Sequence, residues 1–102
     1  MILARVPLRI SIAGGGTDDP RYAKEDGGFA ITAAISQYIY ISVNKTFTEG
    51  YKLRYSETEE ADGISAIKHP IIREALKFYD VPPNVEIVSL ADIPSGTGLG
   101  SS

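Results

Sequence analysis

The amino-terminal stretch alternates apolar and polar residues in the way that a β-strand does. Between residues 2 and 13 the chain is rich in aliphatic residues, and Ile10 and Ile12 alternate with polar neighbours. Because successive side chains of a strand point to opposite faces, this pattern predicts a strand over 2–13. Three glycines at 14–16 end the pattern. The polar residues that follow, up to a glycine pair at 27–28, predict a loop that can hold one helical turn.

The middle of the chain carries three further stretches with β patterning. Residues 29–36 and 38–44 predict two strands, although their junction lacks a strong turn signal, and residues 51–56 predict a shorter strand. The acidic stretch 57–62 is interpreted as a solvated loop, because nothing orders its carboxylates toward one point as a metal site requires.

From Pro70 the spacing of apolar residues changes to that of a helix. Apolar residues recur at intervals of three and four as far as Tyr79, and proline suits the first turn of a helix. We expect the helix to end near 80–82. His69 is assigned a boundary or partly buried structural role, because no acidic or nucleophilic partner stands near it in sequence. A last strand over 85–90 completes an α+β domain with a largely antiparallel or mixed sheet and helix packing.

Composition and charge narrow the class of partner. The 102 residues are 43% hydrophobic and 23% charged, which is ordinary for a globular domain and supports one small core. The net charge is -3 and the lysines and arginines are scattered, which argues against nucleic acid as the main partner. The chain has no cysteine, and no apolar run approaches the roughly 20 residues of a membrane span. We therefore expect no membrane partner and a cytoplasmic location.

The end of the sequence is a glycine-rich run, Pro94-Ser-Gly-Thr-Gly-Leu-Gly-Ser-Ser102. Glycine at alternate positions removes side chains where a phosphate must approach the backbone, and leaves successive N–H groups free to point at phosphate oxygens. The hydroxyls of Ser101 and Ser102 would add donors or a magnesium ligand. The run is not a Walker A motif, since no lysine precedes its last serine, and its glycine spacing differs from the dinucleotide fingerprint. Taken alone, the run is also typical of a flexible tail or linker.

A second glycine-rich segment, PLRISIAGGGTD, runs from Pro7 to Asp18. Arg9 lies within the predicted strand and can reach an anionic group. Thr17 and Asp18 follow the glycines and can hydrogen-bond the hydroxyls of a sugar or a phosphate ester. The alternative is a surface arginine followed by a turn built from glycine and aspartate.

Together these two segments resemble the GHMP kinases, the family of galactokinase, homoserine kinase and mevalonate kinase. The phosphate-loop motif of that family runs Pro, three variable residues, Gly-Leu, one variable residue and Ser-Ser. The residues that match it here are Pro94, Gly98, Leu99, Ser101 and Ser102. The first segment, followed by a glycine pair and a strand, looks most like the family's kinases of D-glycero-D-manno-heptose 7-phosphate. The resemblance covers residues 5–102.

The resemblance implies an ATP-dependent sugar kinase that transfers the γ-phosphoryl group of MgATP to a sugar hydroxyl. It assigns the ATP phosphates to Gly96, Gly98, Gly100, Ser101 and Ser102, with Ser102 also a ligand of Mg²⁺, and it assigns the sugar to Arg9, Thr17 and Asp18. The implied fold is that of the family's amino-terminal domain, which contains a left-handed βαβ crossover. Galactokinase carries a Glu-His pair where this chain has Gly15 and Gly16. Galactose is therefore not expected, and a bulkier or phosphorylated sugar fits better.

The resemblance also implies that residues 1–102 are a partial amino-terminal domain that ends within its phosphate loop. In the family a catalytic aspartate lies beyond the position of Ser102, and a third motif lies in a carboxy-terminal domain. We therefore expect no catalytic residue within the chain, no kinase activity from the 102-residue polypeptide alone, and self-association through surface that a following helix would cover. The alternatives are a related kinase for a fucose-type sugar or a mevalonate-type alcohol, and a non-catalytic α+β module with a glycine-rich linker.

Overall fold

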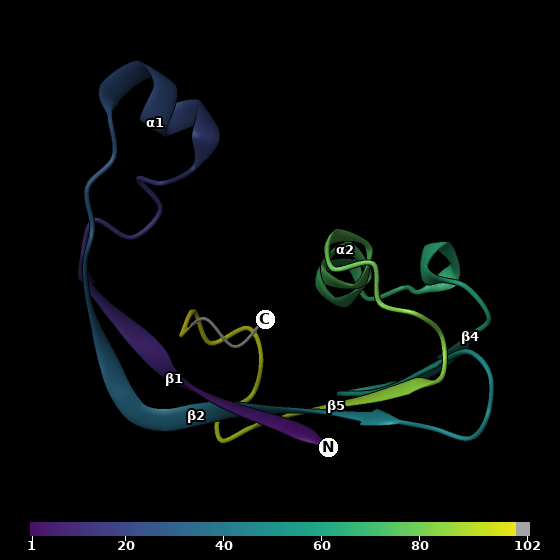
Figure 1. Cartoon of the computed structure of the whole chain (residues 1–102). Helices are drawn as coiled ribbons and strands as arrows, with labels where there is room; N and C mark the ends of the chain where they lie inside the picture. The colour runs from purple at the N-terminus through teal and green to yellow at the C-terminus, as the bar shows by residue number, and fades with distance from the viewer. Residues whose placement is uncertain (100–102) are drawn as a thin grey trace. The chain divides into compact units, whose positions relative to one another are not determined.

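The computed structural model describes residues 1–99, and its five strands form one sheet in the order β1-β2-β5-β3-β4 (Figure 1). The strands are β1 (Ile2–Ala13), β2 (Ile31–Lys45), β3 (Tyr51–Arg54), β4 (Thr58–Ala61) and β5 (Val85–Ala91). The helices are α1 (Pro20–Asp26) and α2 (Pro70–Phe78), with a 3₁₀ turn, η1, at Ile64–Ala66. Because β3 pairs antiparallel with β4 and parallel with β5, the sheet is mixed. The predicted α+β class is confirmed.

The chain divides into two compact units. Unit 1 comprises residues 1–5 and 40–90, and unit 2 comprises residues 6–39 together with the chain from residue 91 onward. Unit 1 holds α2, η1, β3, β4 and most of β5, whereas unit 2 holds α1 and both glycine-rich segments. All the predicted site residues that the structure describes therefore belong to unit 2. Within residues 1–99, no helix is long and apolar enough to cross a membrane.

Three of the predicted elements differ from the structure. The stretch 17–26, predicted as a loop with one helical turn, contains the seven-residue helix α1. Apart from residues 29 and 30, the stretches 29–36 and 38–44, predicted as two strands, lie in one continuous strand, β2, because their junction holds no residue that would turn the chain. The acidic stretch 57–62, predicted as a solvated loop, instead contains β4. A polar strand is stable here because β4 lies at the edge of the sheet and Glu60 stands opposite Lys52, with 4.0 Å between the charged groups.

The core of unit 1 lies between α2 and the strands β3 and β5. Figure 1 shows α2 and η1 on the same face of these strands. The buried side chains come from each of the neighbouring elements: Tyr51, Leu53, Ile67, Leu76, Val85 and Ile87. Leu53 has no exposed surface, and the Tyr51 hydroxyl donates to the Val81 carbonyl at 2.8 Å. Apolar burial therefore drives the folding of this unit, and the buried hydroxyl keeps a hydrogen-bond partner.

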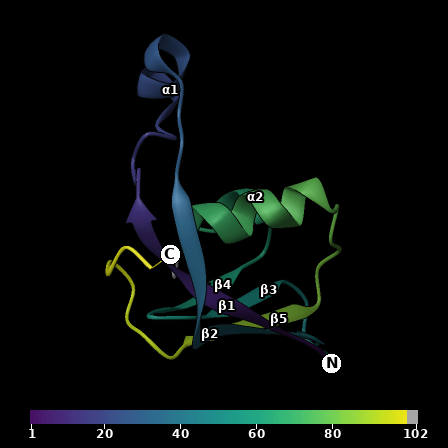
Figure 2. The same ribbon diagram turned by 90° about the vertical axis from the view of Figure 1, so that its left-hand side faces the viewer.

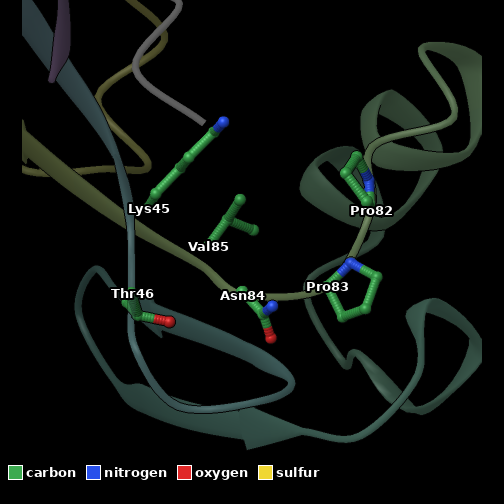
Figure 3. A pocket seen from close by; sticks show the side chains of 6 residues that line it. All are labelled: Lys45, Thr46, Pro82, Pro83, Asn84 and Val85. Carbon is green, nitrogen blue, oxygen red and sulfur yellow. The ribbon is translucent and has the colours of Figure 1, made fainter.

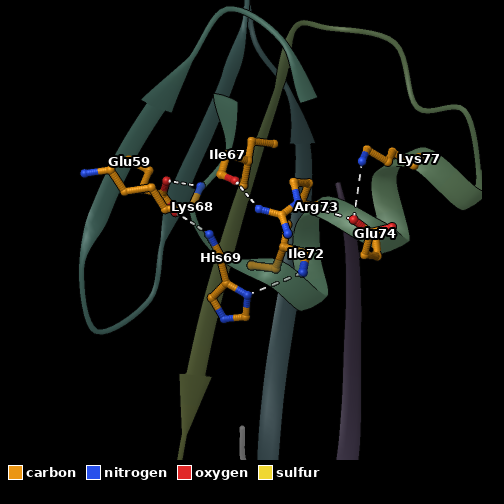
Figure 4. Close-up of polar contacts among 8 residues, drawn as sticks. All are labelled: Glu59, Ile67, Lys68, His69, Ile72, Arg73, Glu74 and Lys77. Carbon is orange, nitrogen blue, oxygen red and sulfur yellow. Dashed lines mark hydrogen bonds and ion pairs between the residues drawn. The ribbon is translucent and has the colours of Figure 1, made fainter. Parts of the chain in front are cut away.

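The start of α2 is fixed by His69, which Figure 4 shows, and by Pro70. His69 is the N-cap residue, and its Nδ1 accepts the N–H of Ile72 at 3.3 Å. Pro70 occupies the first helical position, where the missing N–H costs nothing. In the next turn, the Arg73 guanidinium donates to the Ile67 carbonyl at 3.1 Å. The structural role predicted for His69 is confirmed.

Glu59 ties β4 to the segment that leads into α2 (Figure 4). One carboxylate oxygen accepts the Lys68 N–H at 2.7 Å, and the other accepts the His69 N–H at 3.2 Å. The second oxygen also accepts the Tyr55 hydroxyl at 2.7 Å. Desolvation is the largest single influence on the pKa of Glu59 and raises it, but these hydrogen bonds and the charge of Lys68 together outweigh it and lower the pKa. The hydrogen bond to Glu59 raises the pKa of Tyr55 to about 12.

We expect Glu59→Gln to destabilise the chain at neutral pH and to reduce its loss of stability in acid. Folding lowers the Glu59 pKa below its ordinary value of 4.5, so the carboxylate stabilises the fold fully above that value. This contribution is lost as the pH falls through the folded-state pKa. Chemical denaturation at a series of pH values from neutral down to about pH 3 measures it.

Glu60→Gln is the matched control for this experiment, because Glu60 is the exposed neighbour of Glu59 on the same strand. The control should follow the wild-type stability profile closely. If Glu59→Gln lost as much stability between neutral and acid pH as the wild type does, the hydrogen bonds of Glu59 would not be the source of the acid dependence.

Unit 2 is organised around the loop between β1 and β2, which contains α1 (Figure 2). Asp19 is the N-cap of α1, and its Oδ1 accepts the Arg21 N–H at 2.9 Å. Pro20 begins the helix, and Gly27 ends it with a φ of 74°. Leu8 on β1 is buried in this unit and is 1% exposed.

Candidate functional site

A backbone hydrogen bond joins the two glycine-rich segments. The N–H of Arg9 on β1 donates to the carbonyl of Leu99 at 3.0 Å, although these residues stand near opposite ends of the sequence. Both residues belong to unit 2. The strand that carries a predicted sugar ligand therefore lies directly beside the predicted phosphate loop. These two segments come into contact only through the fold.

The glycine-rich loop is held where it leaves β5. The Asp92 N–H donates to the Tyr38 carbonyl at 2.9 Å, and the Asp92 carboxylate accepts the Tyr38 N–H at 2.8 Å. Further along the loop, the Thr97 hydroxyl donates to the Pro94 carbonyl at 3.2 Å. Asp92 is not among the site residues predicted from the sequence. No local signal identifies it, because its partner on β2 lies 54 residues earlier in the chain.

Gly96 and Gly98 adopt a backbone conformation that side chains rarely adopt. Their φ angles are 82° and 75°, and a Cβ at either position would meet no atom within 4 Å. The backbone conformation therefore requires these glycines, whereas neighbouring protein atoms do not. The space that a side chain would fill is open, as the approach of a phosphate to the backbone requires. The other predicted phosphate ligands, Gly100, Ser101 and Ser102, lie outside the described residues.

The charged groups of Arg9 and Asp18 are available to a ligand. The Arg9 guanidinium donates to the Ser11 hydroxyl at 3.4 Å and forms no ion pair within residues 1–99. Among the described residues, the exposed Asp18 carboxylate likewise has no hydrogen-bond or ion-pair partner. Asp19 is different, because hydrogen bonds from the side chain and the N–H of Arg21 lower the pKa of its carboxyl. Of the two adjacent carboxylates, Asp18 is the one left for a ligand.

The hydroxyl of Thr17 is largely occupied by the protein itself. Its Oγ1 lies 2.8 Å from the carbonyl oxygens of both Gly14 and Phe29, and accepts the Phe29 N–H at 3.1 Å. A threonine hydroxyl has one proton and two lone pairs, so it donates to one carbonyl at a time and keeps a single lone pair unused. The predicted role of Thr17 as a sugar ligand therefore depends on that lone pair alone.

A cavity of about 280 Å³ lies in unit 1, away from the predicted site residues in sequence (Figure 3). The residues that line it are Lys45, Thr46, Pro82, Pro83, Asn84 and Val85. Two polar groups here serve the fold, because the Thr46 hydroxyl donates to the Thr48 carbonyl at 2.8 Å and the Thr46 N–H donates to the Asn84 carbonyl at 2.8 Å. Among the described residues, no three histidine, aspartate or glutamate side chains form a group that could hold a metal ion. Unit 2 is the better candidate for the functional site, because both glycine-rich segments and their hydrogen bond belong to it.

No family model matches the chain, but individual proteins do. The chain is 33% identical to a D-glycero-α-D-manno-heptose 7-phosphate kinase of Campylobacter jejuni, over 99% of this chain and 33% of the kinase. It is 28% identical to an L-fucokinase/L-fucose-1-P guanylyltransferase of Bacteroides fragilis, over 100% of this chain and 14% of that protein. The chain thus spans about a third of the length of the first of these relatives and a smaller part of the second.

Two solved structures that resemble this chain are sugar kinases as well. A D-glycero-D-manno-heptose 1-phosphate kinase of Bacteroides thetaiotaomicron superposes with a TM-score of 0.78 and 23% identity, over 99% of this chain and 37% of that one. A structure from Campylobacter jejuni assigned as a sugar kinase superposes with a TM-score of 0.64 and 27% identity, over 96% of this chain and 35% of that one. This chain therefore has the α+β fold that about a third of each of these sugar kinase chains adopts. Within that class its similarity extends to heptose phosphate kinases, which confirms the resemblance predicted from the two glycine-rich segments.

Proposed function

We propose that this chain is the part of an ATP-dependent sugar kinase in which the phosphate loop meets the loop that binds the sugar. The observation that carries the proposal is the hydrogen bond between the Arg9 N–H and the Leu99 carbonyl. It joins an open glycine backbone, suited to phosphates, to a strand and loop that present a guanidinium and a carboxylate. The sequence similarity to a heptose 7-phosphate kinase and to a fucokinase supports a sugar as the acceptor.

In a kinase of this type, catalysis depends mainly on positioning and on stabilisation of charge. The backbone at Gly96 and Gly98 would receive the phosphates of ATP, together with the predicted ligands Gly100, Ser101 and Ser102. Ser102 would also bind Mg²⁺, which prefers oxygen ligands and, when bound, neutralises phosphate charge. Asp18 would accept hydrogen bonds from sugar hydroxyls, and Arg9 would hold an anionic group of the substrate.

We further propose a bulky or phosphorylated sugar, of which heptose 7-phosphate is the first choice. A Cβ at Gly16 would meet no atom within 4 Å, and one at Gly15 would lie no closer than 3.5 Å to the Ser11 side chain. The loop therefore leaves open the space that side chains at these positions would take. The sequence identity to the heptose 7-phosphate kinase, 33%, also exceeds that to the fucokinase, 28%. A fucose-type acceptor is the second candidate.

The partners that this function requires are MgATP and a sugar phosphate, and we place the protein in the cytoplasm, where both are found.

Exposed apolar residues on the edge strand β1, such as Ile12, which is 68% exposed, also favour self-association at high concentration. Because the chain spans 33% of its relative, we propose that the 102-residue polypeptide alone binds ligands without turnover.

Binding to this polypeptide tests the proposal residue by residue. In ¹H–¹⁵N spectra, MgATP should shift the amide signals of Gly96, Gly98 and Leu99, and heptose 7-phosphate should shift those of Arg9 and Asp18. Inorganic phosphate at the same concentration is the control and should give weaker shifts. Saturable shifts that map to the cavity of unit 1, or none in unit 2, would contradict the proposed site.

A further inference from the structure

Thr17 closes the loop that runs from Gly14 to Phe29. Its hydroxyl contacts the carbonyls of both end residues at 2.8 Å and accepts the Phe29 N–H at 3.1 Å. The Thr17 N–H also donates to the Gly14 carbonyl at 3.2 Å. These four contacts join the residue that follows β1 to the segment that leads into β2. All three side-chain contacts involve the hydroxyl, so the oxygen of Thr17 is what holds the two ends of the loop together.

Two glycines allow the ends of the loop to come this close. A Cβ at Gly14 would lie 1.9 Å from the Phe29 carbonyl oxygen, and a Cβ at Gly28 would lie 2.6 Å from the Thr17 carbonyl oxygen. Both distances are far shorter than van der Waals contact, and the atoms met belong to the backbone. The loop is thus closed by the Thr17 hydroxyl, and Gly14 and Gly28 provide the space for the two ends to approach. A side chain at either glycine would force the ends apart.

Asp18 is the residue that this closure fixes in place. Its neighbour Thr17 is held by the contacts above. Its other neighbour, Asp19, donates its N–H to the Gly16 carbonyl at 3.1 Å and caps α1 through the Arg21 N–H at 2.9 Å. The backbone of Asp18 is therefore fixed from both sides, while its carboxylate makes no hydrogen bond or ion pair within residues 1–99. A rigid backbone that carries an unpartnered carboxylate is an arrangement suited to holding a ligand.

We propose that Thr17 is a positioning residue, whose hydroxyl closes the loop so that Asp18 meets the sugar in a fixed place. The proposal gives Thr17 a role different from the sugar contact predicted from the sequence. It rests on the proposed function for the identity of the ligand at Asp18, whereas the closure itself rests on the contacts of Thr17. Thr17→Ser, which retains the hydroxyl, should preserve the loop closure. Thr17→Val, which has nearly the same shape but no hydroxyl, should not.

Amide exchange in the absence of any ligand tests the closure. In Thr17→Val, the Phe29 amide loses its acceptor and should exchange about tenfold faster than in the wild type. In Thr17→Ser, it should exchange within about twofold of the wild-type rate. Exchange at the wild-type rate in the valine variant would overturn the closure. Because no ligand is present, this result does not depend on whether the protein is a kinase.

Calorimetry with heptose 7-phosphate tests the positioning role in the natural protein that carries this sequence. Thr17→Val should lower the affinity for the sugar phosphate about tenfold and leave the affinity for MgATP unchanged. Thr17→Ser should bind the sugar phosphate as the wild type does. Since Thr17 acts through Asp18, the double variant with Asp18→Asn should bind no more weakly than Asp18→Asn alone. Additive losses would overturn the positioning role. If the wild type bound no sugar phosphate, the positioning role would fail with the proposed function, and the exchange result would still decide the closure.

Discussion

Replacement of Gly14 by alanine is expected to open the loop between β1 and β2 and to destabilise unit 2 by about 3 kcal/mol or more. Two effects combine at this position. The φ angle of Gly14 is 77°, a conformation that strains an alanine, and the new Cβ would lie 1.9 Å from the Phe29 carbonyl oxygen. The second contact cannot be relieved by a side-chain rotation, because both partners belong to the backbone. Chemical denaturation, followed through the amide exchange of unit 2, measures the loss.

Gly16→Ala is the matched control for this prediction. Gly16 also has a positive φ angle, 90°, but a Cβ there would meet no atom within 4 Å. The control therefore carries the backbone strain without the collision, and should cost about 1–2 kcal/mol. Equal costs for the two variants would show that the close approach of Gly14 to Phe29 is not a feature of the molecule in solution.

Asp18→Asn is expected to lower kcat/KM for heptose 7-phosphate about 10- to 100-fold in the natural protein that carries this sequence. The reason is that a carboxylate accepts stronger hydrogen bonds from sugar hydroxyls than an amide oxygen does. The KM for MgATP should stay the same, because the nucleotide is assigned to the other glycine-rich segment. Steady-state kinetics with each substrate varied in turn separates the two effects.

The adjacent carboxylate provides the control for Asp18. Asp19 caps α1 and pairs with Arg21 at 3.3 Å, and asparagine retains the capping hydrogen bond. Asp19→Asn should therefore keep activity within about twofold of the wild type. If it were as damaging as Asp18→Asn, the loss would reflect the charge of the loop as a whole and not a contact of Asp18.

The elements with strong local patterns could be predicted from the sequence. The alternation before Gly14 predicts β1, and the apolar spacing after Pro70 predicts α2, because in both cases one face of the element must be buried and the period shows in the residues. The position of Pro70 at the start of α2 follows from its missing N–H. The two glycine-rich segments were recognisable for a similar reason, since their unusual composition is itself the signal.

The features that were missed depend on residues far apart in the chain. The polar strand β4 forms because Lys52 stands opposite Glu60 and because Glu59 receives backbone N–H groups ahead of α2, and neither partner is visible in the acidic stretch itself. Asp92 was overlooked because it bonds to Tyr38 on another strand. Hydrogen-bond partners at such separations are set by the fold and cannot be read from local residue types.

Thr17 shows the same limit within the candidate site. A threonine after a glycine run can bind a sugar hydroxyl, and residue type alone supports that interpretation. Whether the hydroxyl meets a ligand or the protein's own backbone depends on how closely the loop closes, which Gly14 and Gly28 determine. The role of Asp18 as a ligand residue stays a prediction, and its carboxylate has no hydrogen-bond or ion-pair partner in the described chain.

Phosphoryl transfer tests the central claim most directly. The natural protein that carries this chain is incubated with MgATP and heptose 7-phosphate, and the products are followed by ³¹P NMR, with galactose as the control acceptor. We predict Mg²⁺-dependent formation of ADP and a heptose bisphosphate, no product from galactose, and no turnover by the 102-residue polypeptide alone. Failure to phosphorylate heptose 7-phosphate, heptose or L-fucose would contradict the assignment of this chain to a sugar kinase.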